Sequence, residues 1–207
     1  NMGTLQQSAG DLILVTNGTG AATVVNNAGI DFGTSNVGGA LSATASAGNI
    51  TQNGGAITVA GTSSFILGAN SANVVLDHAS NAFSGAVTLL AGAGGSQAFG
   101  NVTFVDDSAV KIDANADAAG DLYLNAGTDG AVGGNLAVTA TTGNITQGVA
   151  VAVTGTSAFT TSASDATITL GTTTNALGGT VAFTTAGTAG NVVIDNGTTG
   201  LDLAAST

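Results

Sequence analysis

Short stretches of alternating apolar and polar residues recur along the whole chain. Each has a small residue, one variable residue, and then two apolar residues separated by one other. The pattern occurs at residues 10–14, 55–59, 85–89, 100–104, 120–124, 134–138 and 179–183. Alternation over about five residues, bounded by Gly, Asn and Ser, predicts short strands with one buried face. Since successive side chains of a strand point to opposite faces, the residue between the two apolar ones should face outward.

The positions expected to face outward carry mostly polar residues. They are Thr58, Thr88, Thr103, Lys111, Tyr123, Thr169 and Asp202. The only Lys and the only Tyr of the chain fall on this face. Neither residue type enters the definition of the pattern, so their placement supports it independently.

A longer repeat of roughly 94 residues is superimposed on the short pattern. Residues 38–52 read GGALSATASAGNITQ, and residues 133–147 read GGNLAVTATTGNITQ. The Gly-Thr-Ser-x-Phe phrase at 61–65 returns at 155–159, which is one residue less than the spacing between the first two stretches. The stretch at 190–194 also resembles 100–104. We interpret residues 1–207 as one segment that holds three parts: a partial copy (1–37), a copy (38–132) and an incomplete copy (133–207).

Strands this short cannot bury a face on their own, and a solenoid in which each coil stacks on the previous one is the economical arrangement. Equivalent residues then lie about 4.8 Å apart, so aliphatic and Phe side chains form interior ladders while columns of like charge are avoided. At about 20–24 residues per coil, we expect an all-β parallel β-helix of about nine or ten coils, roughly 45 Å long. A β-sandwich or a Greek-key barrel is the alternative, but neither predicts a long-range register with a one-residue slip.

The composition excludes several classes of protein. The 207 residues include one Lys, no Arg and twelve acidic residues, all Asp, for a net charge of −11. A nucleic-acid surface needs clustered cations, so we expect no nucleic-acid partner. The absence of Cys removes disulfides, thiolate metal sites and cysteine nucleophiles. No apolar run reaches the roughly 18 residues of a membrane span, so no membrane insertion is expected.

Two groups of residues could carry chemistry. His78 follows Asp77, as in half of a catalytic pair, but the chain has no second His and the aligned residue in the next copy is Thr172. We therefore expect His78 at a solvent-facing corner. The acids Asp106, Asp107, Asp113 and Asp117 could offer oxygen ligands to calcium.

The calcium-binding Gly-Gly-x-Gly-x-Asp repeat is absent, and the aligned Asp195-Asn196 keeps one acid, so ordinary surface acidity is the simpler interpretation. Singly scattered acids do not form the paired carboxylates of a glycosidase. Polysaccharide lyases of this fold commonly use Arg or Lys. The sequence thus predicts a protein that is not an enzyme, with no catalytic, cofactor-binding or metal-binding residues.

Two further residue patterns have both a functional and a structural interpretation. Thr pairs at 139/141, 154/156 and 167/169 resemble the rows of ice-binding solenoids, but strands such as 87–89 break the row, so ordinary strand-surface Thr is expected. Asn-x-Thr glycosylation sequons occur at Asn17, Asn49, Asn101, Asn144 and Asn196. Asn that recurs at one repeat position predicts first a turn residue or a stacked amide ladder. The Asn-Gly pairs at 17–18, 53–54 and 196–197 indicate tight turns.

Three features of the sequence carry a resemblance to a known family. They are the Gly-Asn-Ile-Thr-Gln phrase at 48–52 and 143–147, the Thr-Gly-Thr-Ser-x-Phe phrase at 154–159 and the Gly-x-apolar-x-apolar strands. In these features the chain resembles the large bacterial β-strand-repeat proteins, which are similar to the filamentous-haemagglutinin class of secreted adhesins. The resemblance covers essentially the whole chain. It implies a right-handed parallel β-helix, an extracellular or cell-surface location, and a role as stalk, adhesin or biofilm matrix fibre. Such stalks carry no catalytic residues to transfer.

We therefore expect a structural repeat segment of a secreted or cell-surface bacterial adhesin or fibre, acting as a rigid stalk and contact surface. Its partners would be neighbouring copies of itself, adjoining repeats of a parent chain, or surface carbohydrate. The alternative is a subunit that assembles into an extracellular filament by head-to-tail stacking, since an open β-helix end presents unpaired backbone groups. A carbohydrate-binding module would need an exposed aromatic platform, which Tyr123 alone does not make.

Overall fold

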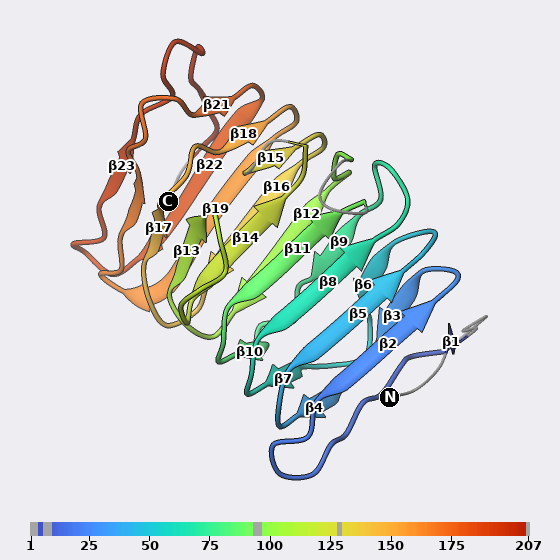
Figure 1. Cartoon of the computed structure of the whole chain (residues 1–207). Helices are drawn as coiled ribbons and strands as arrows, with labels where there is room; N and C mark the ends of the chain where they lie inside the picture. Colours follow the sequence, from blue (N-terminus) through green and yellow to red (C-terminus); the bar gives the residue numbers. More distant parts are fainter. Residues whose placement is uncertain (1–3, 6–9, 93–96, 128–129, 206–207) are drawn as a thin grey trace.

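Parallel strands wind into a column with two long sheets along its sides (Figure 1). The structure is a computed structural model and describes residues 4–5, 10–92, 97–127 and 130–205. All pairings between its named strands are parallel, and the described residues contain no helix, so none that could cross a membrane. The prediction of an all-β parallel solenoid is confirmed.

Sheet A has ten strands and sheet B has eight. In spatial order, sheet A contains β1 (Thr4–Leu5), β2 (Ala22–Asn26), β5 (Leu41–Ala45), β8 (Ser63–Leu67), β11 (Val87–Ala91), β14 (Asp121–Asn125), β13 (Val110–Asp113), β17 (Ile145–Gln147), β20 (Ile168–Leu170) and β23 (Val192–Ile194). Sheet B, from the opposite end, contains β24 (Asp202–Leu203), β22 (Thr180–Ala186), β19 (Ser157–Ser164), β16 (Leu136–Ala140), β12 (Val102–Asp106), β9 (Val74–Leu76), β6 (Ile50–Gln52) and β3 (Ile30–Phe32).

Two short sheets complete the cross-section, one in each half of the column. Sheet C contains β4 (Ser35–Val37), β7 (Ile57–Val59) and β10 (Ala82–Phe83). Sheet D contains β15 (Ala131–Val132), β18 (Ala152–Val153) and β21 (Ala176–Leu177).

Most coils have the predicted length. Ala43 pairs with Phe65, 22 residues later, and Phe65 pairs with Leu89 after another 24. The exception is the middle of the chain, where Val102 pairs with Leu136, 34 residues later. The longer spacing accommodates β13 and β14, which both join sheet A between two successive strands of sheet B.

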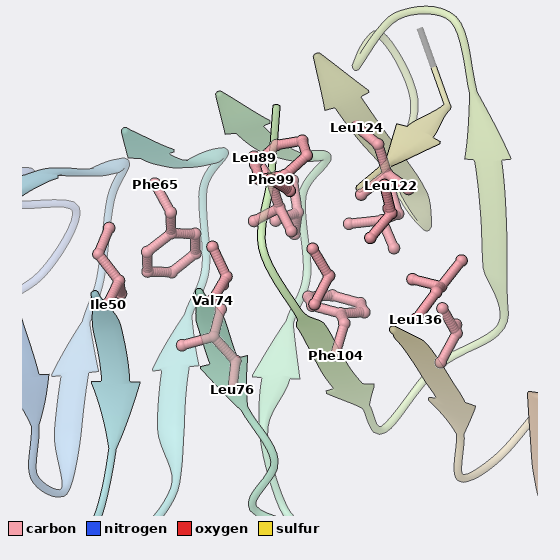
Figure 2. Packing of buried hydrophobic residues seen from close by; sticks show 14 of the residues in the cluster. Ile50, Phe65, Val74, Leu76, Leu89, Phe99, Phe104, Leu122, Leu124 and Leu136 are labelled. Carbon is pink, nitrogen blue, oxygen red and sulfur yellow. The ribbon is translucent and has the colours of Figure 1, made fainter. Parts of the chain in front are cut away.

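The interior is a continuous ladder of aliphatic and aromatic side chains (Figure 2). Phe32, Phe65, Phe83 and Phe104 follow one another along the axis, with ring centroids 6.0, 5.9 and 5.5 Å apart. All four are at most 1% exposed. Such aromatic contacts add to the apolar burial that holds successive coils together.

The predicted alternation is confirmed at the strand where it is most specific. Leu122 and Leu124 are fully buried, whereas Tyr123 between them is partly exposed. Lys111 on the neighbouring strand is exposed, and Ile112 beside it is buried. In both strands the residue between the two apolar positions therefore faces outward.

Glycine opens these motifs because the coils approach one another closely at that corner. A Cβ on Gly85 would lie 2.6 Å from the carbonyl oxygen of Gly61, and one on Gly61 would lie 2.7 Å from the carbonyl carbon of Gly39. In the second copy a Cβ on Gly134 would lie 2.6 Å from the oxygen of Gly100. Any larger residue in this column would push adjacent coils apart.

The two copies of the repeat place equivalent strands on opposite sheets. Leu41 of β5 lies in sheet A, but its repeat equivalent Leu136 of β16 lies in sheet B. Ile50 of β6 lies in sheet B, and its equivalent Ile145 of β17 lies in sheet A. The chain runs A, B, C in the first half and A, D, B in the second, so the second copy is turned about half a revolution around the axis.

The region between β12 and β16 produces this turn. From β12 in sheet B the chain returns to sheet A as β13, loops back, and enters sheet A again as β14. The later strand lies between β11 and β13, and Lys111 of β13 faces Asp121 of β14. The sequence did not predict this reversed strand order.

Candidate functional site

A buried pair of amide side chains joins two coils at a corner of the first copy. Gln52, at the end of β6, and Asn81, just before β10, are 8% and 0% exposed. Gln52 Nε2 donates to Asn81 Oδ1 at 2.6 Å, and Asn81 Nδ2 donates to Gln52 Oε1 at 2.9 Å. Asn81 Oδ1 also accepts the Ile57 N–H at 2.9 Å. These bonds satisfy polar groups that would otherwise be costly to bury.

The second copy builds the same corner from equivalent residues. Gln147 Nε2 donates to Asn175 Oδ1 at 2.8 Å, and Asn175 Nδ2 donates back to Gln147 Oε1 at 2.9 Å. Asn175 Oδ1 accepts the Val151 N–H at 2.8 Å. We call these two sets, with the residues that follow them along the axis, the corner ladder.

One coil further on, the corner ladder continues with Asp106 in the first copy and Asn196 in the second. Each lies two residues after the resembling stretches 100–104 and 190–194. Asp106 Oδ1 accepts the Phe83 N–H at 2.9 Å, and Asn196 Oδ1 accepts the Leu177 N–H at 2.8 Å. An acid in one copy therefore has the role of an amide in the other.

Asp106 is buried, which corrects the prediction that it is an ordinary surface acid. It is 2% exposed, and it also accepts the Asp107 N–H at 2.9 Å and the Ser108 hydroxyl at 2.8 Å. Burial raises the pKa of its carboxyl above the usual value, and the neighbouring Asp107 adds to the rise, while the hydrogen bonds oppose it. The sequence signal was its alignment with Asn196, in a position where a charge is not required.

A second ladder of asparagines runs along the exposed corner before sheet B. The side-chain oxygens of Asn49, Asn73 and Asn101 accept the main-chain N–H groups of Asn73, Asn101 and Asn135 at 2.9, 2.7 and 2.9 Å. Asn144 similarly accepts the Thr167 N–H at 2.8 Å, at the corner before sheet A. The predicted stacked ladder is confirmed for the sequon residues Asn49 and Asn101, whereas Asn144 bonds to a threonine of the next coil.

The remaining candidate residues do not gather into one site. His78 lies in an exposed turn, where its Nδ1 accepts the Ser80 N–H at 3.1 Å, as expected for a corner residue. Lys111 forms an ion pair with Asp113, and this contact raises the pKa of Lys111 and lowers that of Asp113. Asp117 is exposed in the loop between β13 and β14. Within the described ranges, no three His or Asp side chains come close enough to hold a metal ion.

The Thr pairs do not form one row. Thr139 lies in sheet B and Thr169 lies in sheet A, whereas Thr154 and Thr156 lie in the connection between β18 and β19. These three pairs therefore do not lie on one flat face, as an ice-binding row of Thr pairs would require.

A groove lies over sheet D and has a volume of about 450 Å³. Its floor is the outward column of Ala131, Ala152 and Ala176, and its walls come from 97–98 and 126–127. Apart from Gln97 the lining side chains are small, and none carries a charge. The groove offers shape but no group suited to acid–base or nucleophilic chemistry.

The last described coil differs from the earlier ones in the exposure of its apolar side chains. Val192, Leu201 and Leu203 are 39%, 39% and 56% exposed. Val102, the repeat equivalent of Val192, is 1% exposed, and the residues that pair with Val192 and Leu203 in the preceding coil, Ile168 and Val181, are fully buried. The last described coil therefore exposes apolar side chains that a further coil would cover.

A family model described as repeats of unknown function (DUF5649) matches residues 19–90 and 99–184. No curated protein and no solved structure matches the chain. The two matched segments fall on either side of residues 91–98 and together cover most of both halves of the column.

Proposed function

The chain belongs to this family of repeats of unknown function. We propose that it is a structural segment of a secreted or cell-surface bacterial adhesin or fibre. The segment holds other parts of such a protein away from the cell and offers its sides as contact surfaces. The observation that carries the proposal is the continuity of sheets A and B through both copies of the repeat.

That continuity favours a stiff column. The corner ladder and the exposed asparagine ladder each join a coil to the next, in addition to the backbone pairing of the sheets. Neighbouring coils of a solenoid stabilise one another, so a long repeat array behaves as one rod.

The sides of the column favour many weak contacts over one specific site. The outward residues of sheet B from β6 to β19 are uncharged, for example Thr51, Val75, Ala137 and Thr160. Such a face suits surface carbohydrate or sister chains. The single Lys leaves one trypsin-type cleavage point, which suits a protein outside the cell.

The location can be tested on intact cells that produce the protein. Antibodies raised against residues 1–207 should label the surface of unpermeabilised cells or the medium, and external protease should remove the cell-bound signal. A cytoplasmic protein of the same cells is the control for leakage. Labelling that appears only after permeabilisation would contradict the proposal.

Head-to-tail assembly into a filament is the second candidate, in which Val192, Leu201 and Leu203 of the last described coil would contact a second copy. A further coil, from a second copy, would bury these side chains and pair with β23 and β24. Light scattering and negative-stain microscopy of purified chain should then show fibres, and Leu203→Asp should prevent them. Thr184→Asp, on the outer side of β22, is the matched control and should not. Unchanged short particles at all concentrations would exclude this candidate and leave the stalk.

A further inference from the structure

Three Asn-Gly pairs occur in turns of the column, and they differ in the hydrogen bonds of the asparagine side chain and of the glycine N–H. They are Asn17-Gly18, Asn53-Gly54 and Asn196-Gly197. In this dipeptide the glycine nitrogen can attack the asparagine side chain, because glycine has no side chain to hinder the approach. The reaction requires a side chain that is free to move and a glycine N–H that is not already bonded.

Asn17 and Asn196 begin turns of the same geometry. The Gly20 N–H donates to Asn17 O at 3.1 Å, and the Thr199 N–H donates to Asn196 O at 3.0 Å. The glycine after each asparagine has nearly the same φ, 58° in Gly18 and 56° in Gly197. Backbone conformation therefore does not distinguish the two pairs.

The side chain of Asn196 is held on both ends. Its Oδ1 accepts the Leu177 N–H at 2.8 Å, and its Nδ2 donates to the oxygens of Leu177, Thr199 and Gly200 at 3.2, 3.1 and 3.3 Å. The Gly197 N–H donates to Asp195 Oδ1 at 2.8 Å, so the attacking nitrogen is also occupied. Asn196 is 7% exposed.

Asn17 and Asn53 lack these restraints. Both are exposed, and among the described residues no hydrogen bond holds either side chain or the N–H of Gly18 or Gly54. The main-chain N–H of Asn53 donates to Phe32 O at 3.0 Å, which fixes the backbone but leaves the side chain free.

We propose that Asn17 and Asn53 are sites of spontaneous deamidation, and that the corner ladder protects Asn196. The deprotonated glycine nitrogen forms a bond to the asparagine Cγ, the Cγ–Nδ2 bond breaks, and ammonia leaves with a proton taken from solvent. Water then opens the cyclic imide at one of its two carbonyls and yields aspartate or isoaspartate. The net exchange is one water for one ammonia, with no oxidant or reductant.

Each event adds one negative charge to a chain that already carries −11. Isoaspartate also lengthens the backbone by one carbon, at a corner where Asn53 is paired with the preceding coil through Phe32. A long-lived extracellular protein would accumulate these changes at Asn17 and Asn53 first.

Peptide mass spectrometry with an isoaspartate-specific methyltransferase assay tests the proposal on unmodified chain. Folded protein in mildly alkaline buffer should convert Asn17 and Asn53, with Asn196 at least about a hundredfold slower because several hydrogen bonds must first open. The same protein in denaturant should convert all three at similar rates. Asn53→Gln should remove one product and leave Asn17 unaffected.

Equal conversion of Asn17 and Asn196 in the folded protein would overturn the proposal. So would resistance of Asn17 and Asn53 in the folded state while the denatured control reacts. A second variant, Asp195→Ala, frees the Gly197 N–H, and its folding can be checked by circular dichroism. It should raise the rate at Asn196 without changing the rate at Asn17.

Discussion

Replacing Asp106 by Asn should stabilise the protein at neutral pH. Asp106 occupies the position that Asn196 occupies in the second copy, and both cap a main-chain N–H of the preceding coil at nearly the same distance. An asparagine keeps an oxygen for the Phe83 and Asp107 N–H groups, and its amide can donate to the Ser108 hydroxyl. The substitution therefore keeps the bonding pattern and removes a buried charge.

The magnitude follows from two opposing effects. The substitution weakens three hydrogen bonds, because their acceptor is no longer charged. It also removes the free-energy cost of burying a carboxylate beside Asp107. The raised pKa of Asp106 shows that burial and repulsion outweigh the hydrogen bonds. We expect a gain of about 1 kcal/mol in the free energy of unfolding. For a chain of this length, that raises Tm by about 2–4 °C.

The same raised pKa also determines how the effect depends on pH. Because the pKa of Asp106 is higher in the folded than in the unfolded protein, the unfolded chain ionises first as pH rises from about 4. The native protein loses stability until the folded pKa is passed, and then remains at the lower level. The advantage of Asp106→Asn should therefore appear as pH rises above about 4 and vanish below it.

Urea unfolding followed by circular dichroism at a series of pH values measures this difference. Asp107→Asn is the matched control, since it removes an exposed carboxylate next to the buried one and should change stability far less. A variant that is less stable than the wild type at neutral pH would refute the reasoning. A gain that does not change with pH would refute the assignment to ionisation.

Three further substitutions, two of them paired with a control variant, test the ladders and the corners where coils approach closely. Asn196→Asp places a carboxylate against three main-chain oxygens and should cost about 2–4 kcal/mol at neutral pH and less in acid, measured by urea unfolding. Asn81→Ala leaves the buried Ile57 N–H without its partner and removes two hydrogen bonds of the Gln52 amide, so it should cost about 2–4 kcal/mol, whereas Asn101→Ala on the exposed ladder should cost under about 1 kcal/mol by the same assay. Gly85→Ala should lower the free energy of unfolding by about 1–3 kcal/mol through contact with the preceding coil, while Gly171→Ala, which meets nothing within 4 Å, should be nearly neutral.

The local pattern of the sequence predicted the coils because each coil buries alternate side chains of its strands in the same way. The strands around Leu89, Leu122 and Leu136 begin within two residues of the expected glycine, and their leucines are buried. The motif at 10–14 is weaker, since Leu12 forms only an isolated bridge, but Leu12 and Leu14 are still buried and Ile13 is exposed. Alternation thus predicted which side chains face inward even where no regular strand forms.

The arrangement of the middle region could not be predicted in this way. Residues 110–113 and 121–125 both have strand character, but nothing in either stretch specifies that the later one lies nearer β11. That order depends on the conformation of the 114–120 loop and on the pairing of Lys111 with Asp121, and both are determined by tertiary contacts. Asp106 was missed for a similar reason: a single Asp carries no local sign of burial.

The half-turn between the copies changes what the repeat can display. Thr44 and Thr139 occupy equivalent outward positions, but one lies on sheet A and the other on sheet B. In a solenoid whose repeats all have the same orientation about the axis, equivalent residues of successive repeats form one stripe on one side of the column. Contacts made by that stripe are then all on the same side. Here a surface that recurs in the repeat appears on opposite sides in the two copies. If further copies repeat the junction of residues 107–135, the column would present each contact surface to both sides in turn, an arrangement that suits bridging between two neighbours through many weak contacts.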